Sequence, residues 1–156
     1  MTKLGLFTFS QIFVKSRVTS LEDNPGLSDD ERQFRQLLRR PDVFILFPTK
    51  SSHDASKLFS LENRRKSYVL VVLDGTWREA KKMFVRSPAL QQLPAIHLDL
   101  RSLDRKSEYV VRTQPTDQCL STVEIVAHTI AILENDASVV EKLVAPLRAL
   151  CSIQVF

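Results

Sequence analysis

The sequence predicts an α/β fold with a mostly parallel sheet flanked by helices. Two runs, Val43–Phe47 and Val69–Leu73, are apolar without a polar break, which is typical of strands buried on both faces of a parallel sheet. Segments with a helical spacing of apolar residues separate these runs and follow them, and strands that alternate with helices favour a parallel sheet. With 156 residues, 44% of them hydrophobic, the chain is long enough for one domain with a substantial core.

We expect residues 1–27 to be a variant or poorly ordered N-terminus and residues 28–156 to form the folded domain. Residues 1–21 contain three basic residues and no acidic residue, which loosely resembles a mitochondrial transit peptide. An unrelated N-terminal segment or a poorly ordered tail explains the same composition, and we prefer that interpretation.

The first helix is expected to begin at Ser28 and to end near Arg40. Ser28 and Glu31 have the spacing of a capping box, in which each residue satisfies a backbone N–H of the other. Pro41 disfavours helical backbone at the residue before it and so ends the helix. The strand at residues 43–47 comes next, and a short helix is expected around residues 54–61.

A strand, a turn and a helix follow one another between residues 68 and 85. Asp74 places a carboxylate where the strand ends, Gly75 lets the backbone turn, and Thr76 and Glu79 have the spacing of a second capping box. In open α/β sheets, ligands bind at the carboxyl ends of strands and at the amino ends of the following helices. Asp74, Thr76 and the single tryptophan, Trp77, are therefore candidate site residues. A helix cap beside a packed tryptophan explains the same residues without a ligand.

Basic residues share one face of this helix. Arg78, Lys81 and Lys82 are spaced at i, i+3 and i+4, and the chain has a net charge of +4. Both features are compatible with an anionic partner such as RNA. A run of charges on a helix is also the usual composition of a solvated face.

The chain after residue 87 is expected to contain two more strands and two helices. Residues 88–94 are expected to form a surface connection, residues 95–100 a strand that contains His97, and residues 108–112 another strand. His97 is expected to be a packed or surface residue. Ser121 is the expected cap of a helix of about thirteen residues with a clear apolar stripe. The final helix, residues 138–149, contains Pro146 and is expected to break or to end early.

Composition excludes several classes of protein. No apolar run approaches the roughly 18 residues of a membrane span, so the sequence predicts no membrane partner. The two cysteines, Cys119 and Cys151, lack the Cys-x-x-Cys spacing. They indicate a reducing compartment and predict no metal site in this chain.

Two ordered motifs resemble one known family. Asp74–Trp77, with the sequence DGTW, resembles the Asp-x-Thr-Trp signature of the DTW-domain proteins, the tRNA-uridine aminocarboxypropyltransferases. Downstream, Tyr109–Pro115 is similar to a Tyr-x-x-Arg-x-x-Pro segment of that family, and Leu120–Glu124 is similar to its Leu-Ser-Thr-x-Glu segment. The resemblance covers roughly residues 40–153.

The resemblance implies a fold related to the SPOUT superfamily, in which the sheet is knotted and the knot holds the cofactor. The residue pattern itself shows no knot. The family implies that S-adenosylmethionine, as group donor, is held by the loops after Phe47, after Leu73 and from Arg112 to Thr122. The residues implied for donor binding are Phe47, Pro48, Leu73, Asp74, Leu120, Ser121 and Thr122.

The activity implied by the resemblance is transfer of a 3-amino-3-carboxypropyl group from S-adenosylmethionine to N3 of a tRNA uridine. A carboxylate that removes the N3 proton would assist this transfer, and Asp74 is the candidate; a purely structural role in the turn is the alternative. Trp77 would stack on a base or pack into the interface of helix and sheet, and Thr76 would cap the helix. The implied tRNA contacts are Arg78, Lys81, Lys82 and Arg112, although Arg112 would equally neutralise the carboxylate of the donor.

The chain also departs from the family pattern. Family members carry a cysteine-rich segment and further strands before this region, whereas no cysteine precedes Cys119 here. We therefore expect the chain to correspond to the C-terminal part of the family domain, N-terminally truncated, with uncovered sheet edge that favours marginal stability or oligomerisation. The alternative to an active enzyme is a truncated, non-catalytic RNA-binding remnant, and methyl transfer is a weaker third alternative. Cytoplasm and nucleus are the expected locations.

Overall fold

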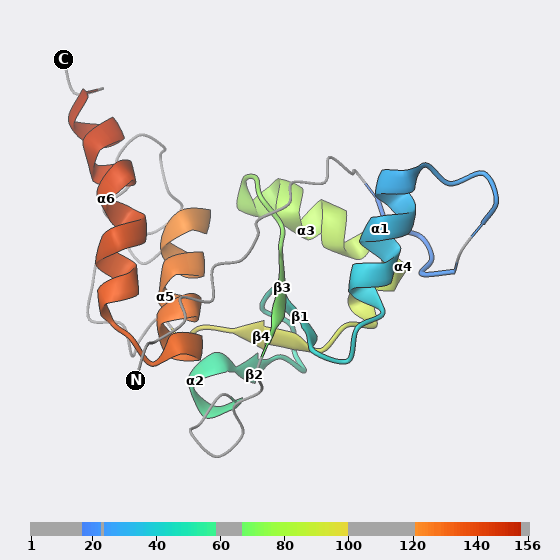
Figure 1. Cartoon of the computed structure of the whole chain (residues 1–156), viewed down its shortest axis with the longest axis horizontal. Helices are drawn as coiled ribbons and strands as arrows, with labels where there is room; N and C mark the ends of the chain where they lie inside the picture. The colour runs from blue at the N-terminus through green and yellow to red at the C-terminus, as the bar shows by residue number, and fades with distance from the viewer. Residues whose placement is uncertain (1–16, 23, 59–66, 100–120, 154–156) are drawn as a thin grey trace. The chain divides into compact units, whose positions relative to one another are not determined.

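The computed structural model describes residues 17–22, 24–58, 67–99 and 121–153 (Figure 1). The elements in chain order are α1 Asp29–Leu38, β1 Val43–Leu46, β2 His53–Asp54, α2 Ala55–Leu58, β3 Val69–Val72, α3 Trp77–Val85, α4 Pro88–Gln91, β4 Ala95–His97, α5 Thr122–Glu134 and α6 Ser138–Ile153. Helices and strands alternate along most of this order, so the predicted α/β class is confirmed.

The four strands form one parallel sheet in the order β2-β4-β1-β3. Val43 pairs with Val69 and Leu46 pairs with Val72, so β1 and β3 begin and end together. On the other side, β2 pairs with β4 in parallel. The predicted parallel sheet is therefore confirmed, whereas the knot and the SPOUT relationship stay predictions.

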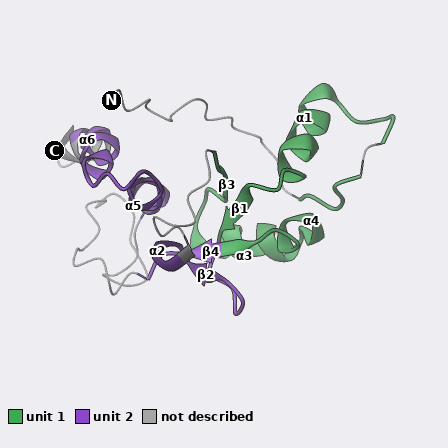
Figure 2. Cartoon of the chain, turned by 60° about the horizontal axis from the view of Figure 1, so that its bottom comes forward, with its two compact units in different colours: residues 1–46, 65–95 green, residues 47–64, 96–156 purple. Residues whose placement is uncertain are grey.

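The chain divides into two compact units (Figure 2). Residues 1–46 and 65–95 form the first unit, which contains α1, β1, β3, α3 and α4. Residues 47–64 and 96–156 form the second unit, which contains β2, α2, α5 and α6. Each unit has buried apolar residues of its own.

The two long apolar runs differ in burial. In β1, Val43, Ile45 and Leu46 are buried, and Ile45 has no exposed surface. All four residues of β3 are only half-buried, so the prediction that this strand is buried on both faces is wrong. The sheet order supplies the reason, because β1 lies between two strands and β3 is the last strand of the order.

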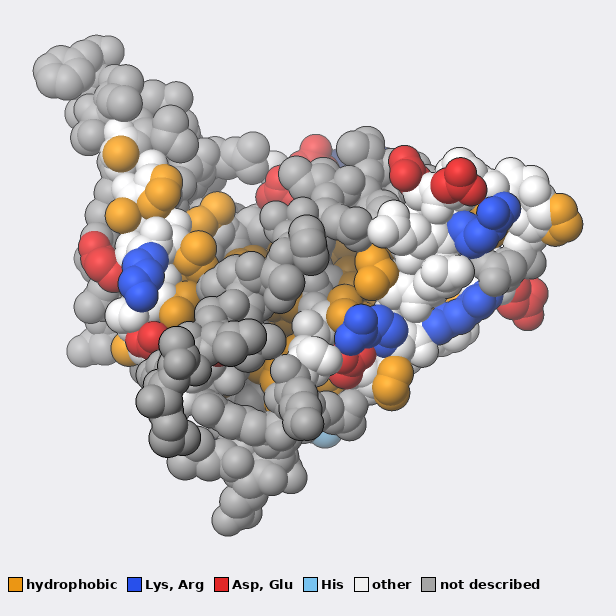
Figure 3. Space-filling model, in the orientation of Figure 1, with side chains coloured by type: hydrophobic (Ala, Val, Ile, Leu, Met, Phe, Trp, Pro, Cys, Tyr) orange, Lys and Arg blue, Asp and Glu red, His pale blue; other side chains and the backbone are white. Residues whose placement is uncertain are grey.

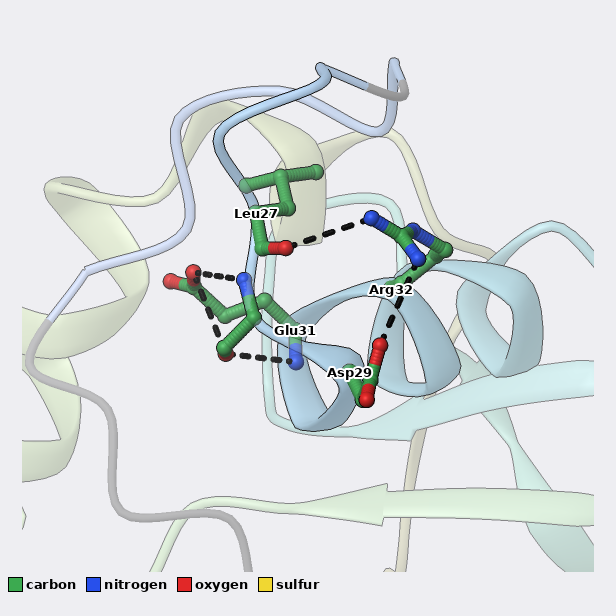
Figure 4. A network of polar contacts seen from close by, with 5 residues as sticks. Leu27, Asp29, Glu31 and Arg32 are labelled. Atoms are coloured by element: carbon green, nitrogen blue, oxygen red, sulfur yellow. Dashed lines mark hydrogen bonds and ion pairs between the residues drawn. The ribbon is translucent and has the colours of Figure 1, made fainter.

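The first helix follows its local sequence closely. Ser28 caps α1, and Glu31 completes the predicted capping box (Figure 4). The side chain of Arg32 donates to Asp29 and to the backbone oxygen of Leu27. This network fixes where the chain enters the helix, and the prediction for its start is confirmed.

The segment before α1 is attached to the first unit. Val18 is buried; its N–H donates to Ser87 Oγ at 3.0 Å. The N–H of Ala89 donates back to the carbonyl oxygen of Val18. Arg35 and Arg39 of α1 donate to the backbone oxygens of Glu22 and Leu21. The predicted boundary near residue 27 stays a prediction, although residue 18 already belongs to the core.

Three predictions of the local structure need correction. The connection at residues 88–94 contains helix α4 with buried Ala89 and Leu90, because proline at the first position of a helix favours its start. The expected helix at residues 54–61 is present as α2 and begins at Ala55, because Asp54 belongs to strand β2; its predicted end lies outside the described residues. The strand predicted for residues 95–100 ends at His97, and the one at 108–112 lies outside the described residues.

The final helix also differs from its prediction. α6 continues through Pro146 to Ile153, although proline removes one hydrogen bond of a helix and costs about 3 kcal/mol. Val144 of α6 packs with Ala127 of α5, and Val140 and Leu143 pack against this pair. Packing of an apolar face contributes most of the stability of helices in proteins, so it offsets the missing bond here. In α5, both the cap at Ser121 and its partner Glu124 are confirmed.

Candidate functional site

The turn after β3 presents the residues of the Asp-x-Thr-Trp motif. Gly75 has φ +145°, a conformation that residues with a side chain rarely adopt. A Cβ at this position would lie 3.2 Å from Glu79 Oε2. Glycine is therefore favoured by the backbone conformation, and a Cβ here would also require the Glu79 side chain to shift slightly.

The Thr76 hydroxyl is occupied by the second capping box. It donates to Glu79 Oε2 at 2.7 Å and accepts from the N–H of Glu79 at 3.3 Å. The N–H of Thr76 donates to the same carboxylate oxygen at 2.8 Å. The predicted role of Thr76 as the helix cap is confirmed, and its participation in catalysis stays a prediction.

Asp74 and Trp77 are both exposed. Asp74 makes no side-chain hydrogen bond within the described part of the chain, and Trp77 is 54% exposed. This exposure argues against the alternative in which Trp77 packs into the interface of helix and sheet. A carboxylate and an indole thus reach the surface on the two sides of the Gly75-Thr76 turn.

The outer face of α3 is basic with apolar positions between the charges. Arg78, Lys81 and Lys82 are exposed, as expected from their spacing, and Arg86 follows one turn later. Val85 lies among them and is 63% exposed. We name this set, Trp77, Arg78, Lys81, Lys82, Val85 and Arg86, the α3 face. In the view of Figure 3, the Lys and Arg side chains that are visible lie among acidic and apolar ones.

The second unit holds the other residues implied for donor binding. Phe47 is buried, and its N–H donates to the backbone oxygen of Ile96 at 3.0 Å. Pro48 is exposed, and Thr122 is half-buried as the first residue of α5. Ser121 caps that helix, and its N–H donates to the Glu124 carboxylate at 2.7 Å. Leu120 and Arg112 lie outside the described residues.

One further polar pair was missed by sequence reasoning. Ser52 Oγ lies 2.9 Å from Nδ1 of His97, which the sequence predicted to be a packed or surface residue. The two residues are 45 positions apart, and β2, which places Ser52, was not predicted. No local pattern in the sequence could have revealed the pair.

A second carboxylate, Asp42, is part of the framework. Asp42 accepts two hydrogen bonds from the Arg40 guanidinium, at 2.8 and 2.6 Å, and one from Ser67 Oγ at 2.8 Å. Its backbone oxygen accepts from the N–H of Val69 at 3.0 Å. The hydrogen bonds from Arg40 hold the pKa of Asp42 well below its usual range. Asp42 thereby joins the starts of β1 and β3.

The described residues contain neither a candidate metal site nor a candidate membrane span. Within the described ranges, no three His, Cys, Asp or Glu side chains are placed to hold a metal ion. Among the described helices, none is long and apolar enough to cross a membrane.

Comparison with known proteins identifies the family. The model of the DTW domain matches residues 8–155 of this chain. The chain belongs to the DTW-domain family. This match begins well upstream of residue 40, the start of the region that the resemblance was expected to cover.

Three curated relatives of this DTW-domain chain carry related names. The tRNA-uridine aminocarboxypropyltransferase 2 of Drosophila melanogaster is 38% identical over 120 residues, which are 77% of this chain and 45% of the relative. The protein of that name from Mus musculus is 34% identical over 112 residues, 72% of this chain and 36% of the relative. The tRNA-uridine aminocarboxypropyltransferase A of Arabidopsis thaliana is 29% identical over 153 residues, 77% of this chain and 58% of the relative.

The DTW-domain chain therefore spans less than half the length of the first two relatives and somewhat more than half of the third. No solved structure gives a significant match. The family membership consequently comes from sequence, and the described geometry adds where its residues lie.

Proposed function

We propose that this chain transfers the 3-amino-3-carboxypropyl group of S-adenosylmethionine to N3 of a uridine in tRNA. Membership in the family supports this proposal. The observation that carries it is the placement of the motif: Asp74 and Trp77 are both exposed in the turn between a parallel strand and the helix after it. Ligands of parallel α/β sheets bind at such turns.

The proposed reaction assigns a proton acceptor. The N3 lone pair forms a bond to the sulfur-bound methylene carbon of the donor's methionine arm, the carbon–sulfur bond breaks, and methylthioadenosine leaves with the electron pair. N3 is a poor nucleophile while it keeps its proton, so a carboxylate that accepts this proton lowers the barrier. Asp74 is the proposed acceptor, because no described side chain occupies its oxygens.

The donor is proposed to bind through loop backbone and the helix start at Ser121. Phe47 is buried, and the Ser121 hydroxyl accepts from the backbone N–H of Glu124, so these two side chains shape the loops and leave backbone groups to contact the donor. The donor-binding residues of the proposal are those implied by the family resemblance: Phe47, Pro48, Leu73, Asp74, Leu120, Ser121 and Thr122.

The tRNA is proposed to bind on the α3 face. Its cations would contact phosphates, which strengthens binding at low salt, and Trp77 offers an exposed ring on which a base stacks. A tRNA modification of this kind would take place in the cytoplasm or the nucleus.

The test uses purified protein, unmodified tRNA and S-adenosylmethionine. Nucleosides from digested tRNA would be examined by mass spectrometry for aminocarboxypropyluridine, with Asp74→Asn as the matched variant. Product with the wild type and at least a hundredfold less with the variant supports the proposal. A folded wild-type protein that gives no product contradicts it, and a methylated uridine would identify methyl transfer instead.

One observation favours a second function, that of an RNA-binding module without turnover. The α3 face requires no donor in order to bind phosphates, and its four cations are all exposed. Binding of tRNA that falls steeply with salt, without any affinity for S-adenosylmethionine, would indicate this function. Replacing Lys81 and Lys82 with Ala should reduce the slope of log affinity against log salt by about 1 to 2, since each phosphate contact contributes about 0.7 to 0.9.

A further inference from the structure

Ser52 and His97 form a polar pair that the proposed proton transfer does not use. His97 is the last residue of β4, and Ser52 follows the turn that begins at Thr49. Both side chains are half-buried, and Ser52 Oγ lies 2.9 Å from His97 Nδ1. This is the one hydrogen bond of the His97 ring with the described part of the chain.

The neighbouring bonds determine which nitrogen of the ring carries the proton. Ser52 Oγ donates to the carbonyl oxygen of Thr49 at 2.9 Å and accepts from the N–H of Thr49 at 3.1 Å. A hydroxyl has one proton, and Ser52 donates that proton to the carbonyl oxygen of Thr49. His97 Nδ1 must then carry a hydrogen and donate it to Ser52. In the neutral ring, Nε2 consequently keeps a lone pair and acts as an acceptor.

The strand register places a carboxylate opposite His97. Asp54 of β2 is the register partner of His97 in the parallel pair, so the two side chains leave the same face of the sheet. Asp54 Oδ1 accepts from the N–H and the hydroxyl of Ser56, at 2.9 and 2.8 Å. Its other oxygen makes no hydrogen bond with a described residue. A carboxylate oxygen and an imidazole lone pair therefore lie on adjacent strands at their carboxyl ends.

We propose that Asp54 and His97 bind the ammonium group of the amino-acid arm of S-adenosylmethionine. An ammonium group carries a positive charge and three N–H donors and has no acceptor, so two adjacent acceptors, one of them negative, complement it. Both residues lie in the second unit with the loop after Phe47. This inference rests on the proposed function, because it takes its donor from there.

The test compares two ligands that differ in the arm. Calorimetry would measure the affinity of the whole chain for S-adenosylmethionine and for methylthioadenosine, which lacks the amino-acid arm. His97→Ala and Asp54→Asn should each weaken binding of S-adenosylmethionine about tenfold and change that of methylthioadenosine less than twofold. The control is His53→Ala, an exposed histidine that neighbours Asp54 and points to the other face; it should change neither affinity.

Each outcome discriminates between the two proposals. A wild type that binds neither ligand overturns the proposed function and the inference together. A wild type that binds both ligands, with variants that weaken both equally or neither, overturns the inference alone. A loss confined to the ligand with the arm supports it.

Ser52→Ala provides a second variant in case His97→Ala does not fold. Nitrogen-15 NMR of labelled histidine should show the Nδ1-protonated tautomer of His97 in the wild type and a mixture of tautomers in the variant. We expect the affinity for S-adenosylmethionine to fall about threefold with that change. An Nε2-protonated ring in the wild type would overturn the inference.

Discussion

Asp42 and Asp74 lie at opposite ends of the same pair of strands and differ in nearly every respect. Asp42 precedes β1, is 9% exposed and accepts hydrogen bonds from Arg40 and Ser67. Asp74 follows β3, is exposed and makes no side-chain bond with a described residue. A carboxylate whose oxygens are filled by its own fold stabilises that fold. One whose oxygens are unoccupied can serve a ligand, and the two residues allow this contrast to be tested within one unit.

The largest expected effect separates activity from stability at Asp74. Asp74→Asn should lower the rate of product formation at least a hundredfold, since a general base contributes about 10² to 10⁴ to the rate. Its melting temperature should stay within about 2 °C of the wild type, because an exposed substitution changes stability by about 0.5 kcal/mol or less. Transfer assays and thermal melting would measure the two quantities. An Asp74→Asn protein with wild-type activity would contradict the role of Asp74 as base.

The converse result is expected at Asp42. Asp42→Ala should reduce the free energy of unfolding by about 2 kcal/mol, because it removes charged hydrogen bonds and leaves Ser67 without its acceptor. Urea unfolding would measure the loss. Asp30→Ala, an exposed acidic residue in α1, is the control and should change the value by less than 0.5 kcal/mol. Equal losses at both positions would show that the Arg40–Asp42–Ser67 network does not stabilise the fold.

The turn at Gly75 should respond to a single methyl group. Gly75→Ala should cost about 1 to 2 kcal/mol, because φ +145° strains any residue with a Cβ and that Cβ would press on the Glu79 carboxylate. The matched control is Gly26→Ala, where the nearest atom lies 3.8 Å from the added Cβ and no positive φ is found. Chemical denaturation of both variants measures the difference. If the two substitutions cost the same, Gly75 is not required by the turn.

The smallest expected effect is the pH dependence of the stability that Asp42 contributes. Because its pKa is lowered in the folded protein, Asp42 contributes stability that is fully present above the unfolded pKa of about 4. That contribution is lost as the pH falls below this value toward the folded pKa. The stability difference between wild type and Asp42→Asn should therefore shrink by about 1 kcal/mol between pH 6 and pH 3. A difference that grows on acidification would contradict the assignment.

The sequence predicted well what depends on neighbours along the chain. All three capping boxes are present, at Ser28, Thr76 and Ser121, because each is formed by residues three positions apart. The burial of β3 was predicted wrongly, because burial depends on strand order, which the apolar run itself does not encode. The pair of Ser52 and His97 also escaped prediction, since it arises only when β2 and β4 lie side by side.

Within the candidate site too, contacts between neighbours along the chain could be predicted, and features that depend on the fold could not. The capping role of Thr76 could be predicted from its spacing to Glu79. The exposure of Trp77 could not, because a tryptophan at the start of a helix packs or faces solvent according to the angle at which the helix leaves the sheet. The continuation of α6 through Pro146 depended on its packing with α5, which no rule for a single helix contains.

The Ser87 hydroxyl attaches the segment before α1 to the first unit through the N–H of Val18. Ser87 is 1% exposed and accepts from the N–H of Val18, a residue that precedes the first helix by eleven positions. Deleting residues 1–27 would remove the buried side chain of Val18 and its hydrogen bonds with Ser87 and Ala89, and each lost hydrogen bond costs about 0.5 to 1.5 kcal/mol. A shortened protein that begins at the first helix should therefore be less stable and more prone to proteolysis, with cleavage first around α4.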